Sequence, residues 1–276
     1  MTAAVHSGRR FCETGTTDNS MLTANLGGLE VKIASSTKEI TACQNLRFKV
    51  FYEELGAKSV ATACAEGLDT DGYDHLCDHL MVLDGGNVVG TYRLLRQDKV
   101  DSRLGFYTQG EFDIAPMLHV NASSRFLELG RSCVLRPWRT KRVVELLWQG
   151  IWNYVRLHRL DVMFGCASLS GTDANSLSIP LSYLHHHHLA TGKWAARAHE
   201  DCFVEMNMCP VDSLNPRSAF KSLPPLIKGY LRLGAQVGYG AAADRQFNTT
   251  DVLITLPIEQ IDPRYFNRFG APNRRD

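Results

Sequence analysis

Hydrophobic and polar residues alternate along residues 126–131, and this pattern predicts a β-strand. Pro137 ends the alternation, and from about Thr140 apolar side chains recur at the spacing of an amphipathic helix that runs to about residue 160. Glu128 and Arg131 lie inside the predicted strand, which must be largely buried to be stable. We therefore expect functional side chains on this strand and in the turn that follows it.

The remaining pattern predicts an α/β protein. Residues 1–28 are polar and aperiodic, which indicates a disordered or loosely docked tail, and residues 29–276 are interpreted as one domain with a C-terminal extension. Further strands are expected at 29–33, 79–83, 88–95, 161–168, 203–208 and 251–256, and further helices at 36–56, 177–189 and 224–233. The turn Asp84–Asn87 predicts a hairpin between two of these strands. This succession favours a mixed α/β domain over most of the chain.

Composition excludes several classes of protein. The 276 residues are 44% hydrophobic and 21% charged, which is typical of a globular protein. A formal net charge of +1 excludes a generally basic nucleic-acid-binding protein. No apolar run approaches the roughly 18 residues of a membrane span, and the N-terminal residues lack the apolar core of a secretory signal. We expect a cytoplasmic protein with at most peripheral membrane contact.

Cysteines and histidines give little sign of a metal site. The eight cysteines include no C-x-x-C pair, which argues against a zinc site or a disulfide framework. Four consecutive histidines, His185–His188, would spread over all faces of a helix without acidic partners at helical spacing, so we expect no bound metal. Cys133 follows the central strand motif and is kept as a candidate nucleophile.

Two further charged features admit two interpretations each. Arg47 falls on the apolar stripe of the predicted helix 36–56, where a long cation either extends to solvent or is held for a ligand. The next loop carries three aspartates around an aromatic residue, namely Asp69, Asp71, Tyr73 and Asp74. Such a loop is either solvated or holds a cationic substrate or a metal.

A basic turn precedes the helix that begins near Thr140. Its four cations are Arg136, Arg139, Lys141 and Arg142. Positive charge at a helix N-terminus opposes the helix macrodipole, and a docked anion would offset that cost. The alternative is a solvated turn of lysine and arginine.

Taken in order, these motifs resemble the acyl-carrier-protein-dependent branch of the GNAT fold, which is shared with acyl-homoserine-lactone synthases. The matching residues are Arg47; Asp69, Asp71, Tyr73 and Asp74; Gly90, Arg93 and Leu94; and Glu128, Leu129, Gly130 and Arg131. The chain departs from the pattern at Gly130, where a serine is usual, and at Asp69, where a glutamate is usual.

Longer segments resemble the ornithine-lipid biosynthetic acyltransferases. They are residues 165–173, 181–190, 224–238 and 247–254, and the likeness runs from roughly residue 30 to 270. The resemblance implies a GNAT-like α/β fold with a mixed, mostly antiparallel central sheet flanked by helices. It also implies transfer of a 3-hydroxyacyl group from acyl carrier protein to the α-amine of L-ornithine, which gives lyso-ornithine lipid. No cofactor is bound permanently, since the donor brings its own phosphopantetheine.

Roles for the central strand follow from this interpretation. Aminolysis of a thioester needs a proton acceptor and a polarised carbonyl. Glu128 is the candidate base, with Arg131 as the second catalytic residue, and a buried salt bridge from Glu128 to Arg131 or Arg93 is the alternative. The carbonyl oxygen would meet backbone amides of Ser132, Cys133 and Val134.

Substrate contacts are assigned in the same way. Arg47 and Arg93 would bind the carboxylate of ornithine, and Asp71 and Asp74 would hold its δ-ammonium group. The basic turn of Arg136, Arg139, Lys141 and Arg142 would attract the acidic carrier protein.

Three other functions remain open at this point. The same donor could acylate another amino acid, such as lysine, glutamine or glycine. A catalytically silent GNAT-like domain could bind acyl carrier protein without turnover. An acyl-enzyme could form on Cys133.

Overall fold

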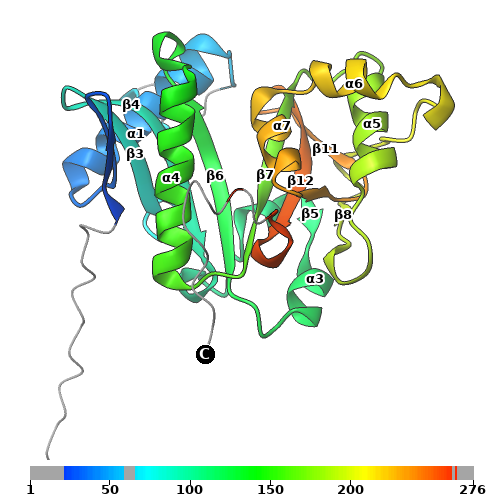
Figure 1. Cartoon of the computed structure of the whole chain (residues 1–276), viewed down its shortest axis with the longest axis horizontal. Coiled ribbons are helices and arrows are strands. Elements are labelled where there is room, and N and C mark those ends of the chain that lie inside the picture. The colour runs from blue at the N-terminus through cyan, green and yellow to red at the C-terminus, as the bar shows by residue number, and fades with distance from the viewer. Residues whose placement is uncertain (1–21, 59–65, 263–264, 266–276) are drawn as a thin grey trace, which may run out of the picture.

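The computed structural model of the chain describes residues 22–58, 66–262 and 265 (Figure 1). A ten-stranded sheet runs through it, in the order β1-β2-β3-β4-β6-β7-β12-β11-β9, with β10 beside β12. Its strands are β1 (Ala24–Leu26), β2 (Leu29–Ile33), β3 (Asp78–Asp84), β4 (Asn87–Arg96), β6 (Phe126–Val134), β7 (Val162–Ser170), β9 (Phe203–Val204), β10 (Gln236–Val237), β11 (Ala241–Asp244) and β12 (Thr249–Pro257). A separate pair joins β5 (Phe112–Asp113) to β8 (Arg197–Ala198).

Helices cover both faces of the sheet. On one face α4 (Lys141–His158) lies in front of β3 and β4, and α7 (Pro225–Arg232) lies near β7 and β12 (Figure 1). The helices α5 (Ser178–His188) and α6 (Pro216–Ser222) pack beside each other near α7, while α3 (Ala115–Val120) lies beyond the lower end of β12. On the opposite face α1 (Thr37–Phe48) packs against β4 and β6 and continues as a π-helix over Lys49–Glu54. No helix in these described ranges is long and apolar enough to cross a membrane.

Most predicted elements are confirmed. The hairpin is β3–β4, and the helix after the basic turn is α4, whose N-cap Thr140 accepts a hydrogen bond from the backbone N–H of Val143. Two expectations differ from the structure. The strand predicted at 203–208 is only the two residues of β9, and β1 occupies residues that the sequence placed in the tail. Residues 1–21 of the predicted tail lie outside the described residues.

The sheet is mostly antiparallel, as expected, and β6–β7 is the parallel pair of strands within it. These two strands pair at only three positions, which end at Glu128 and Phe164. A Cβ atom added to Gly165 would lie 2.2 Å from the carbonyl oxygen of Leu129, so only glycine permits the approach of the two backbones there. Beyond this contact β6 and β7 diverge (Figure 1).

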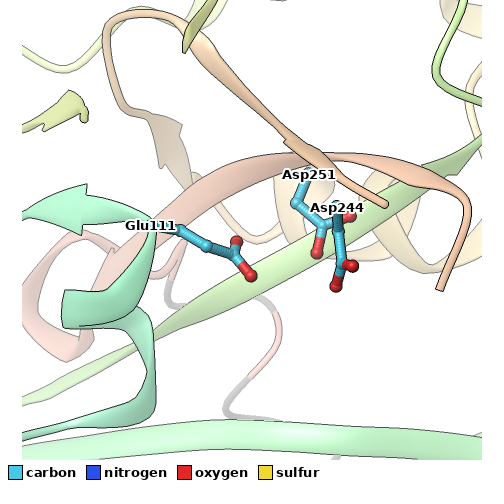
Figure 2. Close-up of side chains that lie close together, drawn as sticks. All are labelled: Glu111, Asp244 and Asp251. Atoms are coloured by element: carbon cyan, nitrogen blue, oxygen red, sulfur yellow. The ribbon is translucent and has the colours of Figure 1, made fainter. Parts of the chain in front are cut away.

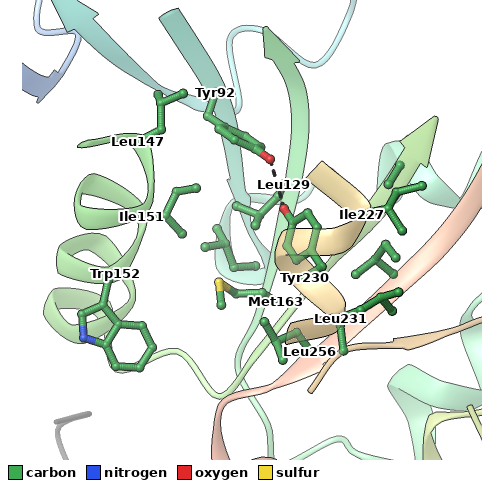
Figure 3. Packing of buried hydrophobic residues seen from close by; sticks show 14 of the residues in the cluster. Tyr92, Leu129, Leu147, Ile151, Trp152, Met163, Ile227, Tyr230, Leu231 and Leu256 are labelled. Carbon is green, nitrogen blue, oxygen red and sulfur yellow. Dashed lines mark hydrogen bonds between the residues drawn. The ribbon is translucent and has the colours of Figure 1, made fainter. Parts of the chain in front are cut away.

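Side chains of the large core bridge the two diverging strands. The hydroxyl groups of Tyr92 on β4 and Tyr230 on α7 lie 3.1 Å apart (Figure 3). The ring of Tyr230 also meets Trp148 of α4 edge to face, with centroids 5.0 Å apart. Packing of α4 and α7 therefore joins the two halves of the sheet where strand pairing is absent.

A β-bulge in β6 changes the direction of one functional side chain. Arg93 pairs with Gly130 and Thr91 pairs with Cys133, so two residues of β6 lie opposite one residue of β4. Arg131, the first of the two, has a φ of 50°, which is uncommon for a residue other than glycine. The bulge brings the Arg131 guanidinium to the face that already carries Arg93.

Candidate active site

A cavity of about 270 Å³ lies where β6 and β7 diverge. Its walls combine charged, aromatic and apolar side chains, which include Phe51, Leu55, Arg93, Tyr107, Thr108, Glu128, Arg131, Ser132, Cys166, Leu226, Asp244, Phe247 and Asp251. A smaller space beside it is lined by Tyr92, Gly165 and Tyr230. The opening between the strands thus connects the face that carries Glu128 with the face that carries α7.

Glu128 is a buried carboxylate in the cavity wall. Its side chain accepts hydrogen bonds from the backbone N–H groups of Tyr107, at 3.0 Å, and Thr108, at 2.6 Å. Burial raises its pKa, although these hydrogen bonds oppose the increase. Among the described residues Glu128 forms no ion pair, so the alternative of a salt bridge to Arg131 or Arg93 lacks support. A fixed carboxylate with a raised pKa suits a proton acceptor.

Three arginines and three aspartates form a largely buried network beside the cavity. Its members are Arg47, Arg93, Arg131, Asp69, Asp71 and Asp74. Their formal charges cancel, and every aspartate has at least one arginine partner. We refer to these six residues as the arginine–aspartate network.

Arg47 is the most deeply buried member. It is 1% exposed and binds Asp74 through two hydrogen bonds of 2.9 Å each, while its Nε lies 2.7 Å from a carboxylate oxygen of Asp69. The side chain therefore neither extends to solvent nor lines the cavity. In this structure its partners are the aspartates of the predicted substrate-binding loop.

Arg93 and Arg131 are the two arginines of the network that line the cavity. Arg93 donates to Asp71 at 2.6 Å, and Arg131 donates to Asp69 at 3.2 Å and to Asp71 at 3.1 Å. Both guanidinium groups also lie over the ring of Tyr107, at 5.6 and 4.8 Å from its centroid. The loop thus holds two cations at the wall of the cavity.

The predicted backbone amides lie at the bulge and just after it. Cys133 and Val134 pair with β4, and Ser132 lines the cavity. The Cys133 thiol is buried against Leu46 and Val50, and burial raises its pKa. Because a raised pKa disfavours the thiolate, the geometry does not support an acyl-enzyme on this residue.

The basic turn lies at the N-terminus of α4. Arg139 binds both carboxylate oxygens of Glu54, at 2.6 and 2.9 Å, and Lys141 lies 3.5 Å from Glu145. Arg136 and Arg142 are exposed and form no ion pair with a described residue. Two of the four cations predicted for the basic turn are therefore available to an external anion.

Sequence analysis missed a second group of carboxylates. Side-chain oxygens of Glu111, Asp244 and Asp251 lie within 4.8 Å of one another (Figure 2). Burial is the main cause that raises the pKa of Glu111 to about 8 and that of Asp251 to about 6, and repulsion between the carboxylates adds to it. The available signal was Asp251, an acid within an apolar strand, whereas Glu111 and Asp244 lie in ordinary polar stretches.

Replacement of Arg47 should destabilise the fold strongly. Arg47→Ala leaves Asp69 and Asp74 partly unpaired in the interior, and loss of one partner of a buried pair costs about 3–5 kcal/mol. Urea unfolding measures this change. The control is Arg103→Ala, because Arg103 is 87% exposed in a surface ion pair and should contribute below about 1 kcal/mol. Equal effects of the two substitutions would contradict a buried network.

The Glu111 carboxyl should make stability depend on pH. Its pKa is 4.5 ordinarily and about 8 in the fold, so the folded chain binds the extra proton between these values. Stability should therefore fall as pH rises from about 5 to 8. Glu111→Gln should remove most of this fall, with a gain on the order of 2–4 kcal/mol at pH 8 and little change at pH 5. Thermal unfolding at both pH values tests this, and a variant no more stable at pH 8 would refute it.

Comparison with known proteins finds a matching family model and similar solved structures. Residues 46–149 match the family described as acetyltransferase (GNAT) domain. The AHL synthase LasI is similar in structure, with a TM-score of 0.46 and 12% identity over 90% of this chain and 98% of that chain.

Curated relatives cover nearly the whole chain. An L-ornithine N(alpha)-acyltransferase of Agrobacterium fabrum is 48% identical over 94% of this chain and 90% of its own. One from Brucella abortus is 45% identical over 93% of this chain and 94% of its own. Identity at this level over almost the full length establishes descent, and the chain belongs to the L-ornithine N(alpha)-acyltransferase family.

Proposed function

We propose that this chain transfers a 3-hydroxyacyl group from acyl carrier protein to the α-amine of L-ornithine and forms lyso-ornithine lipid. The assignment of ornithine as the acceptor rests on the sequence identity of 45–48% to curated L-ornithine N(alpha)-acyltransferases over more than nine tenths of the chain. The buried carboxylate of Glu128 in the cavity between β6 and β7 supports the reaction type.

The proposed chemistry is direct aminolysis of a thioester. Glu128 takes a proton from the α-ammonium group, and the neutral nitrogen attacks the acyl carbonyl carbon. As the new C–N bond forms, the C–S bond to phosphopantetheine breaks. A second proton passes from the nitrogen to the leaving sulfur, which departs as a thiol. The products are the amide, the thiol and protonated Glu128, so charge and protons balance. Holding both reactants at the strand opening removes much of the entropic barrier.

Three groups would position the reactants. We assign carbonyl polarisation to backbone N–H groups near Ser132, because this residue lines the cavity just after the bulge. Arg93 and Arg131 both line the cavity and would bind the acceptor carboxylate. Arg47 would act through the network, since it holds Asp69 and Asp74, which in turn orient the two cavity arginines.

The donor would dock at the basic turn. By the resemblance to GNAT enzymes, Thr140 and Arg142 would occupy positions that are glycine in members that bind coenzyme A, and they would add bulk where a diphosphate would lie. Phosphopantetheine on a carrier protein has no adenosine diphosphate, and the carrier protein is acidic. These properties favour the basic turn as the docking surface.

We also propose that the enzyme works in the cytoplasm, where it would contact the membrane peripherally because its product is amphiphilic.

Loss of the Glu128 carboxylate should abolish most turnover. A mixture of the purified chain, 3-hydroxyacyl carrier protein and L-ornithine should form N-acylated ornithine, which mass spectrometry detects. Glu128→Gln keeps the shape but cannot accept the proton, so kcat should fall about 10²- to 10⁴-fold. Glu259→Gln is the matched control, because that carboxylate is 67% exposed in a surface pair. Unchanged turnover in Glu128→Gln would refute its role, and acylation of only another amine would replace ornithine as the acceptor.

Charge reversal in the basic turn should weaken use of the donor. In Arg136→Glu/Arg142→Glu the KM for the acyl carrier protein should rise about tenfold or more at low salt, because these two cations would steer an acidic partner. The kcat and the KM for ornithine should stay near their original values. The difference should shrink as salt screens the charges. Arg103→Glu serves as control, and an equal KM in all three proteins would argue against this docking surface.

A further inference from the structure

The carboxylates of Glu111, Asp244 and Asp251, here called the acidic triad, face one another from three separate elements (Figure 2). Asp244 ends β11 and Asp251 lies in the neighbouring strand β12, while Glu111 follows the short turn of residues 107–110. Asp244 and Asp251 line the same cavity as Glu128. Two members of the acidic triad thus belong to the wall of the candidate active site, and Glu111 lies directly behind them, with its carboxylate within 4.8 Å of theirs.

The members of the acidic triad, unlike those of the arginine–aspartate network, are not ion-paired with arginines in the described part of the chain. No ion pair within the described residues involves any of its members. Asp251 is only 6% exposed, yet its Oδ1 atom has no hydrogen-bond partner in the described part of the chain, and the same holds for Oε2 of Glu111. A buried carboxylate oxygen without a donor is costly. An arrangement of this kind is stabilised when a cation enters the cavity.

We propose that the acidic triad binds the side-chain ammonium group of the diamino-acid acceptor and so determines acceptor specificity. This inference rests on the proposed function and names the part of the site that distinguishes a diamino acid. An alkylammonium group has three N–H donors, one for each carboxylate. A calcium ion prefers about six to eight oxygen ligands and magnesium prefers six, which is more than the three carboxylates supply as single ligands.

Residues 107–111 contact Glu128 at one end and carry Glu111 of the acidic triad at the other. The backbone N–H groups of Tyr107 and Thr108 hold Glu128, and the N–H of Glu111 donates to the carbonyl of Thr108 at 3.1 Å. Cys166 lines the cavity beside this segment, with its Sγ 3.8 Å from the Thr108 hydroxyl. In this proposal the acceptor places its α-amine at Glu128 and its side chain points toward Asp244 and Asp251, which line the same cavity.

This assignment replaces the one predicted for the acidic loop. Asp74 accepts two hydrogen bonds from Arg47, and Asp71 lies 2.6 Å from Arg93 and 3.1 Å from Arg131. An ammonium group would have to compete there with guanidinium groups that are already in place. At the acidic triad Arg131 acts on Glu111 and Asp251 only through space, and no described guanidinium group is ion-paired to any member.

Paired acceptors provide the test. L-Norvaline has the five-carbon chain of L-ornithine without the side-chain ammonium group. Wild-type chain should prefer ornithine by about 100-fold or more in kcat/KM, because a site that binds a polar group rejects the analogue that lacks it. In Glu111→Gln/Asp251→Asn this preference should shrink to within about tenfold, and norvaline should be used at least as well as by wild type. Glu200→Gln, on an exposed surface pair, is the charge control.

Calorimetric titration with ornithine and norvaline gives a readout without turnover. Ornithine should bind wild type more tightly than the double variant, and thermal unfolding checks that both are folded. An unchanged preference for ornithine over norvaline and unchanged binding in the double variant would overturn the assignment. Loss of that preference in Asp71→Asn instead would also overturn it. In both cases the acylation of ornithine itself would still stand. Saturable Mn²⁺ binding that needs the acidic triad and excludes ornithine would also overturn it. Absence of acylated ornithine from wild type would refute the proposed function, and the titration would still decide the ammonium site.

Discussion

Separation of β6 from β7 is the constraint on which the rest of the structure depends. The two parallel strands pair as far as Glu128 and Phe164, and the close contact of Gly165 with Leu129 marks the end of pairing. A pair that stayed hydrogen-bonded would close the cavity. The open strands leave polar backbone groups that a ladder would otherwise satisfy, and these are the groups that can meet a thioester carbonyl. The cost is offset by packing of α4 and α7 through Tyr92, Trp148 and Tyr230.

Two clusters of charged side chains lie on either side of this opening, and they differ in net charge. The arginine–aspartate network is neutral and holds Arg93 and Arg131 in fixed orientations at the cavity wall. The acidic triad has no internal cation among the described residues, and burial raises the pKa of Glu111 to about 8. A neutral buried network mainly positions its members, whereas an unbalanced one favours a ligand of opposite charge. An amino acid with a carboxylate and a second ammonium group complements both.

Several features of the site were predictable because local pattern determines them. Alternation predicted the strand that carries Glu128, the turn at residues 84–87 predicted the β3–β4 hairpin, and Thr140 predicted the start of α4. The position of Arg47 on an apolar helical stripe left open whether it extends to solvent or is held for a ligand, and in the structure it is buried against aspartates. Its partners did not follow, because Asp69 and Asp74 are more than 20 residues away and any of several arginines could have met them.

The sequence by itself determined the family, the mostly antiparallel α/β fold and the strand that carries the candidate base, since strand and helix periodicity and motif order are properties of neighbouring residues. Only the tertiary structure decided which charges neutralise one another and which remain open. Glu111, Asp244 and Asp251 come from three elements that meet only when β11 and β12 pair and residues 107–111 fold against β7. Electrostatic interaction depends on distance in space and on burial, and neither is encoded in the spacing of residues along the chain.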